Sequence, residues 1–109
     1  MLSKKYRLPI QKMLKEKSTA VKTPYFLIKI FRNSLPYSRF GVIVSKKIAR
    51  LAVRRNKLRR LVFSLVRPYS KKIGGKDYLI IISPAIKELK KEEVGEKLKE
   101  YISKILPNG

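Results

Sequence analysis

The residues best suited to chemistry lie in one basic stretch in the middle of the chain. Residues 46–60 contain eight Lys or Arg and no Asp or Glu. Cations without acids beside them attract polyanions, and arginine can grip a phosphate with two parallel hydrogen bonds. The candidate contact residues are Lys46, Lys47, Arg50, Arg54, Arg55, Asn56, Lys57, Arg59, Arg60 and, further along, Arg67.

The residue types that usually carry protein catalysis are scarce. The chain has no Cys and no His, which excludes Cys/His zinc sites, Ser-His triads and imidazole acid–base chemistry. Six of its seven acids fall in residues 77–109, where they alternate with lysines. We therefore predict a binding surface, with no catalytic residue and no metal ligand on the protein.

The charge distribution favours a nucleic acid as the partner. The net charge of +21 resides entirely in residues 1–76, because residues 77–109 contain six Lys and six acids. An anionic membrane is a weaker alternative, since no apolar run is long enough to span a bilayer. A charged stretch that serves solubility alone is the remaining alternative.

The elements that must position this surface follow from apolar spacing. We expect helices over 9–17, 51–67 and 92–105, strands near 20–22 and over 23–32, 39–45 and 77–83, and a turn or short helical piece over 84–89. The order α-β-β-β-α-β-α predicts one α+β domain over 1–109 with a four-stranded sheet, after a flexible basic segment at 1–8. A strand–helix–strand crossover over 39–83 is expected, and such connections are right-handed as a rule.

The apolar face of the helix over 51–67 predicts which side is buried, through Leu51, Leu58, Leu61, Val62, Leu65 and Val66. Phe63 falls on the opposite side by angle, and we favour packing under another element over stacking on a base. Arg54 or Arg55 has an alternative partner in a nearby backbone carbonyl or carboxylate. Asn56 can bind a phosphate or base edge, or can brace the adjoining loop.

The strand over 23–32 has two different faces. Phe26, Ile28 and Ile30 share the side expected to face the core, whereas Tyr25, Leu27, Lys29 and Phe31 share the other. The second set predicts either a further apolar layer under a helix or a groove for single-stranded nucleic acid.

Two adjoining segments resemble a known family. The strand end Gly41-Val42-Ile43-Val44-Ser45-Lys46-Lys47, followed by Ala52-Val53-Arg54-Arg55-Asn56-Lys57-Leu58-Arg59-Arg60, is similar to the protein subunit of bacterial ribonuclease P. Arg7-Leu8 and Asp77-Tyr78 also resemble that family's pattern. The resemblance spans most of the chain.

The resemblance implies an α+β fold with an uncommon left-handed βαβ crossover. It implies a cytoplasmic ribonucleoprotein that binds a catalytic RNA and the 5′ leader of precursor tRNA, and assists endonucleolytic removal of the leader. Mg²⁺ would act through the RNA, and none is predicted on the protein alone. The implied leader cleft comprises Tyr6, Arg7, Ile10, Met13, Leu14, Tyr25, Lys29 and Phe31.

The chain departs from the family pattern at several positions. The loop after Lys47 is one residue longer, with Arg50-Leu51 where Gly-Asn is common, and Phe63 stands where Arg is frequent. Ile10, Leu14 and Lys29 replace cleft aromatics, so leader binding is expected to depend more on charge and less on stacking. A ribosomal or other structural RNA-binding protein remains the alternative, and the sequence does not determine the oligomeric state.

Overall fold

The computed structural model describes residue 7, residues 17–69 and residues 74–106. These residues form an α+β domain with the strands β1 (Thr19–Lys22), β2 (Phe26–Arg32), β3 (Arg39–Ile43) and β4 (Lys76–Ile82). The helices are α2 (Ala52–Val66) and α3 (Lys91–Ile105), and 3-10 turns follow α2 and β4 at Arg67–Tyr69 and Pro84–Glu88. The α+β class and the order of these elements are confirmed. The helix predicted over 9–17 and the segment predicted to be flexible at 1–8 lie outside the described residues, except for Arg7 and Lys17.

The four strands form one mixed sheet in the order β1-β2-β4-β3. β1 pairs antiparallel with β2 and β2 with β4, whereas β3 and β4 are parallel neighbours. β4 therefore lies inside the sheet, and it is almost continuously buried, as its apolar run predicted.

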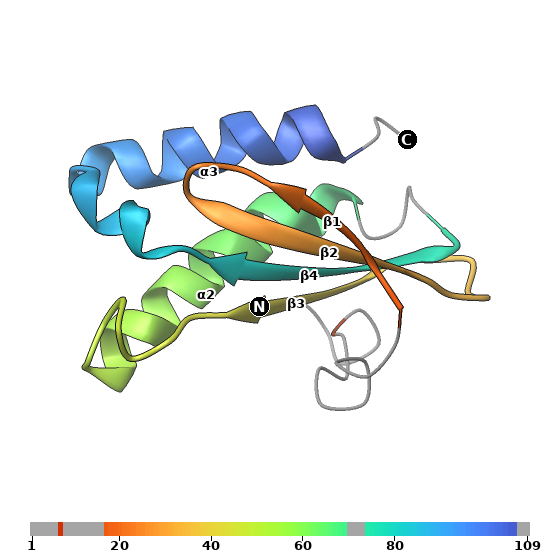
Figure 1. Cartoon of the computed structure of the whole chain (residues 1–109), viewed down its shortest axis with the longest axis horizontal. Coiled ribbons are helices and arrows are strands. Elements are labelled where there is room, and N and C mark those ends of the chain that lie inside the picture. Colours follow the sequence, from red (N-terminus) through yellow and green to blue (C-terminus); the bar gives the residue numbers. More distant parts are fainter. Residues whose placement is uncertain (1–6, 8–16, 70–73, 107–109) are drawn as a thin grey trace.

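The connection from β3 through α2 to β4 crosses behind the sheet in the view of Figure 1. β3 and β4 both run leftward in that view with β4 above β3, so the crossover is left-handed. The general preference for right-handed crossovers gave the wrong hand here, and the family resemblance gave the correct one.

The strand predicted from residue 23 begins three residues later because Thr23 closes a tight turn. Its hydroxyl donates to the carbonyl of Phe26 at 2.8 Å and accepts from the Phe26 amide at 3.0 Å. The Thr23 amide also donates to the Phe26 carbonyl at 2.8 Å. These bonds turn the chain between β1 and β2, which leaves Tyr25 in the turn and not in the strand.

The main core fills the space between the sheet and both helices (Figure 1). Alternate residues of β2 and β4 face it, including Phe26, Ile28 and Tyr78, and the rings of Phe40 and Tyr78 stack with centroids 5.3 Å apart. Burial raises the pKa of the Tyr78 phenol above its ordinary value of 10.0. A smaller apolar cluster, centred on Phe31 and Leu79, occupies the other face of the sheet.

The buried side of α2 differs from the predicted stripe at two residues. Phe63 is 5% exposed within the main core, which confirms the packing interpretation for this ring. Leu51 is 61% exposed, so its predicted place in the core is wrong. Because Leu51 precedes the first turn, where the chain is still extended, its side chain does not follow the helical stripe. α2 contacts both α3 and the sheet, and this widens its buried arc as far as Phe63.

One buried acid joins the parallel strands to the turn before β3. Asp77 is fully buried, and its carboxylate accepts Nη2 of Arg39 at 2.7 Å, Nε of Arg39 at 3.2 Å and the Asn33 side-chain amide. The pairing uses both oxygens of the carboxylate. Asp77 is thus a structural residue, and its charge is compensated locally.

Candidate nucleic-acid interface

The loop between β3 and α2 carries the first cations of the motif. The carbonyl of Ser45 accepts the amides of Ile48 at 3.1 Å and Ala49 at 3.4 Å, which closes a turn with Lys46 and Lys47 at its exposed corner. Ile48 is half-buried and packs against the main core. The loop therefore has an apolar anchor and an internal bond pattern that hold the two lysines outward.

Arg55 fastens this loop to the helix. Its Nη1 donates to the carbonyl of Ala49 at 3.0 Å and to that of Arg50 at 2.7 Å. The predicted alternative, in which Arg54 or Arg55 pairs with a backbone carbonyl, is confirmed for Arg55. A guanidinium suits this task, because its planar array of donors reaches two acceptors while its positive charge stays in place. Arg55 therefore sets the position of Lys46, Lys47 and Arg50 relative to α2.

The outer face of α2 is a ridge of cations. Arg54, Lys57 and Arg60 are exposed, whereas Arg59 is half-buried and donates to the side-chain oxygen of Asn56. Asn56 is itself exposed, and the contact with the adjoining loop, which was one of two alternatives for Asn56, is made by Arg55. Arg67 is exposed in the 3-10 turn beyond the helix.

No acid neutralises this ridge within the described residues. The ion pairs there are Arg39 with Asp77, and Lys97 and Lys104 with Glu100 on α3, and none involves a residue of α2. Adjacent cations repel one another, and a polyanion that approaches the ridge relieves that repulsion. On α3, Glu100 pairs with lysines of the same helix, whereas α2 contains no acid that could pair with its cations.

The motif loop also borders a hollow with a residue that the sequence did not indicate. Lys46, Lys47, Ile48 and Arg50 line a volume of about 580 Å³ together with Lys87 from the 3-10 turn after β4. Lys87 lies in the charge-balanced last third of the chain, where a single lysine carries no recognisable signal. The parallel pairing of β3 and β4 brings Lys87 next to the loop, because both strands run in the same direction and finish at the same end of the sheet.

The residues predicted for a leader cleft do not all share a face. Phe31 is 2% exposed and packs with Leu79, which places it in the predicted second apolar layer. Lys29 alternates with it on β2 and is half-buried. Tyr25 is on the other side of the sheet, against Tyr101 of α3 with ring centroids 5.9 Å apart. The grouping of Tyr25 with Lys29 and Phe31 is wrong, because the turn at Thr23 takes Tyr25 out of the strand alternation.

Arg7 is exposed and forms a parallel bridge with Phe40, at the edge of β3 that β4 leaves free. The other predicted cleft residues lie outside the described residues; they are Tyr6, Ile10, Met13 and Leu14.

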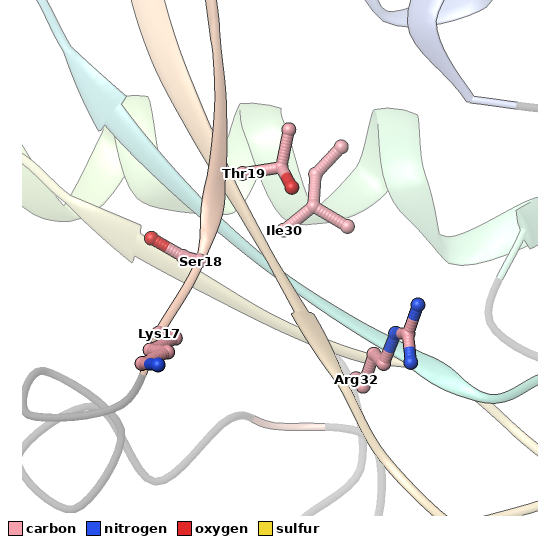
Figure 2. Close-up of a pocket in the computed structure, with 5 residues that line it drawn as sticks. All are labelled: Lys17, Ser18, Thr19, Ile30 and Arg32. Atoms are coloured by element: carbon pink, nitrogen blue, oxygen red, sulfur yellow. The ribbon is translucent and has the colours of Figure 1, made fainter.

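A second hollow, of about 480 Å³, lies beside the edge strand β1 (Figure 2). Its described lining comprises Lys17, Ser18, Thr19, Ile30 and Arg32. Thr19 and Ile30 are register partners across β1 and β2, and Lys17 and Arg32 contribute two cations to the lining.

The described residues contain no group of three or more His, Cys, Asp or Glu side chains that could hold a metal ion. No helix in this part of the chain is long and apolar enough to cross a membrane. The donor set around the basic surface is cationic and does not suit a protein-bound Mg²⁺.

Fold and surface define a class: a small α+β domain whose βαβ crossover helix presents an uncompensated basic ridge. A family model described as Ribonuclease P matches residues 4–106, and the chain belongs to that family.

Similar proteins in two bacteria have the name of this family. The chain is 34% identical over 93 residues to the ribonuclease P protein component of Thermotoga petrophila, covering 79% of this chain and 77% of the relative. It is 34% identical over 76 residues to that of Aliivibrio fischeri, covering 70% and 65%. The matched region thus spans a little under two thirds of the length of the Aliivibrio fischeri relative.

Solved structures extend the likeness to the fold. The RNase P protein from Thermotoga maritima, in complex with 1-(4-fluorophenyl)-2-thiourea, superposes with a TM-score of 0.79 at 27% identity and covers 92% of this chain and 96% of that one. The Staphylococcus aureus RNase P protein gives a TM-score of 0.75 at 26% identity, over 94% and 98% of the two chains.

Proposed function

We propose that this chain is the protein subunit of ribonuclease P, which binds a catalytic RNA and the 5′ leader of precursor tRNA. One observation carries the proposal. Arg55 joins the motif loop and the helix into a single basic surface whose cations have no acidic partner on α2. Because the chain belongs to the ribonuclease P family, the catalytic RNA of that enzyme is the proposed partner among the possible nucleic acids.

The protein's role in this proposal is electrostatic and positional. The catalytic RNA and the precursor tRNA are both polyanions, so they repel each other on approach. A rigid cationic surface between them lowers that repulsion and fixes their relative orientation. The RNA, with its own Mg²⁺, carries the hydrolysis of the phosphodiester bond, and we assign no chemical step to a side chain of this protein.

The leader is proposed to lie along the sheet face opposite the helices. Lys29 is on that face and Arg7 is at the adjoining edge of β3. Phe31 is covered and offers no ring face for stacking. Charge therefore contributes more than base stacking to leader binding among the residues described.

Cleavage of precursor tRNA by the cognate catalytic RNA, with and without this protein, tests the proposal. We expect the protein to raise the cleavage rate most at low Mg²⁺, where the RNA's own charge is least screened. Affinity should fall steeply with salt, by about 0.7–0.9 in log–log slope for each phosphate neutralised. A failure to stimulate cleavage, or a nearly flat salt dependence, would contradict the proposal.

RNA that co-purifies with the protein from its own cytoplasm separates the two RNA-binding candidates. A catalytic RNA of a single kind supports the ribonuclease P subunit. Ribosomal RNA would instead identify a structural RNA-binding protein of similar composition.

A further inference from the structure

The hollow beside the motif loop has walls from two segments that are far apart in the sequence. Lys46, Lys47 and Arg50 come from the loop after β3, and Lys87 comes from the 3-10 turn after β4. Both segments leave the same end of the sheet, on the left in Figure 1, because β3 and β4 are parallel and finish there. The topology of the sheet thus brings a fourth cation to the three in the loop.

Both walls are held by the core. On one side, Ile48 packs inward and Arg55 binds the carbonyls of Ala49 and Arg50. On the other side, Ile86 is 5% exposed in the main core, and its amide donates to the carbonyl of Ser83 at 3.1 Å. The backbone of Lys87 therefore follows a buried residue in a hydrogen-bonded turn, and its position relative to the loop is fixed.

The charge of Lys87 is available to a ligand. Its side chain is exposed and takes part in none of the ion pairs or side-chain hydrogen bonds found in the described residues. The neighbouring acid, Glu88, is exposed but does not belong to the described lining of the hollow. Four cations around a half-buried isoleucine form a concave, strongly positive site.

We infer that Lys87 binds backbone phosphate of the RNA together with Lys46, Lys47 and Arg50, so that the RNA-binding surface extends onto the turn after β4. This inference rests on the proposed function, because it assigns the ligand to RNA. Phosphate oxygens accept short, charge-assisted hydrogen bonds from ammonium and guanidinium groups, which are the two kinds of donor around this hollow. A volume of about 580 Å³ accommodates a phosphate with its adjoining sugar.

Binding of the full-length protein to its catalytic RNA, measured over a series of salt concentrations, tests this inference. Lys87→Ala should weaken binding about three- to tenfold and make the log–log salt slope shallower by about 0.7–0.9, which is the loss of one phosphate contact. Lys99→Ala is the matched control, since Lys99 is an exposed lysine on the charge-balanced α3. It removes the same charge and should change neither quantity.

Lysine acetylation with mass-spectrometric readout provides a second measurement that needs no variant. Bound RNA should protect Lys87 from the reagent and leave Lys99 as reactive as in the free protein. If the wild-type protein binds RNA with a steep salt slope, but Lys87→Ala behaves as Lys99→Ala does or Lys87 is unprotected, the inference is wrong and the proposed function stands. If the wild-type protein does not bind the RNA, both are wrong.

Discussion

Replacement of Arg55 by lysine separates its charge from its geometry. The variant keeps the positive charge, but the lysine side chain is shorter, so its ammonium nitrogen ends short of the position of Nη1 and does not reach the carbonyls of Ala49 and Arg50 together. Hydrogen bonds to charged groups contribute about 1.5–3 kcal/mol each when shielded. Both carbonyls are partly open to solvent, so we take about 1 kcal/mol for each bond. Lysine forms one of these two bonds at most, so the free energy that holds the loop in its conformation falls by about 1 kcal/mol.

That loss should appear as weaker binding, because the RNA must then order the loop itself. A cost of about 1 kcal/mol corresponds to about a fivefold rise in Kd for the catalytic RNA. The salt slope should not change, since the number of cations is the same. Amide hydrogen exchange at Ile48 and Ala49, whose amides close the loop onto Ser45, should become faster in the free protein.

Arg54→Lys is the control for this experiment. Arg54 is an exposed neighbour without a side-chain hydrogen bond in the described structure, so lysine should change Kd by less than twofold. Equal Kd values for the two lysine variants would show that Arg55 acts through its charge alone, and the reasoning would be refuted.

The remaining predictions concern stability, and urea unfolding is the measurement for each of them. Arg39→Met should lower the free energy of unfolding by about 3 kcal/mol, because it leaves the buried Asp77 carboxylate without its cation; a loss below 1 kcal/mol would contradict this role. Phe63→Ala should cost about 3–5 kcal/mol, as for a large buried ring, whereas a solvent-facing or base-stacking ring would give almost no change in the free protein. The neutral form of Tyr78 is favoured in the fold, so its contribution to stability is complete below pH 10 and is lost as pH rises through its raised pKa. The difference in stability between wild type and Tyr78→Phe should therefore change above pH 10, and a constant difference up to pH 12 would argue against the shift.

Composition and spacing were sufficient for most of the architecture. The two-faced pattern of β2 and the amphipathic pattern of α3 depend on neighbours along the chain, so they are visible in the sequence. The buried character of β4 followed from its apolar run, and its place inside the sheet agrees with it. The excess of cations in residues 46–60, together with the lack of His and Cys, predicts a polyanion-binding surface, and this stays a prediction.

Local reasoning was wrong where a contact with another element or a turn bond decides the outcome. Tyr25 was assigned by alternation to the face of Phe31, but the hydroxyl of Thr23 turns the chain before β2 begins. Leu51 was assigned to the core by helical angle, although the helix begins one residue later.

The sequence by itself determined the types of element, their order and the sign of the surface charge, because these depend on residue type and short spacing. The tertiary structure decided which charged residues lie close together. The guanidinium of Arg55 joins loop to helix, and the parallel pairing of β3 and β4 brings Lys87 beside Lys46 and Lys47. Residues about forty positions apart come together through strand order, for which spacing along the chain contains no signal.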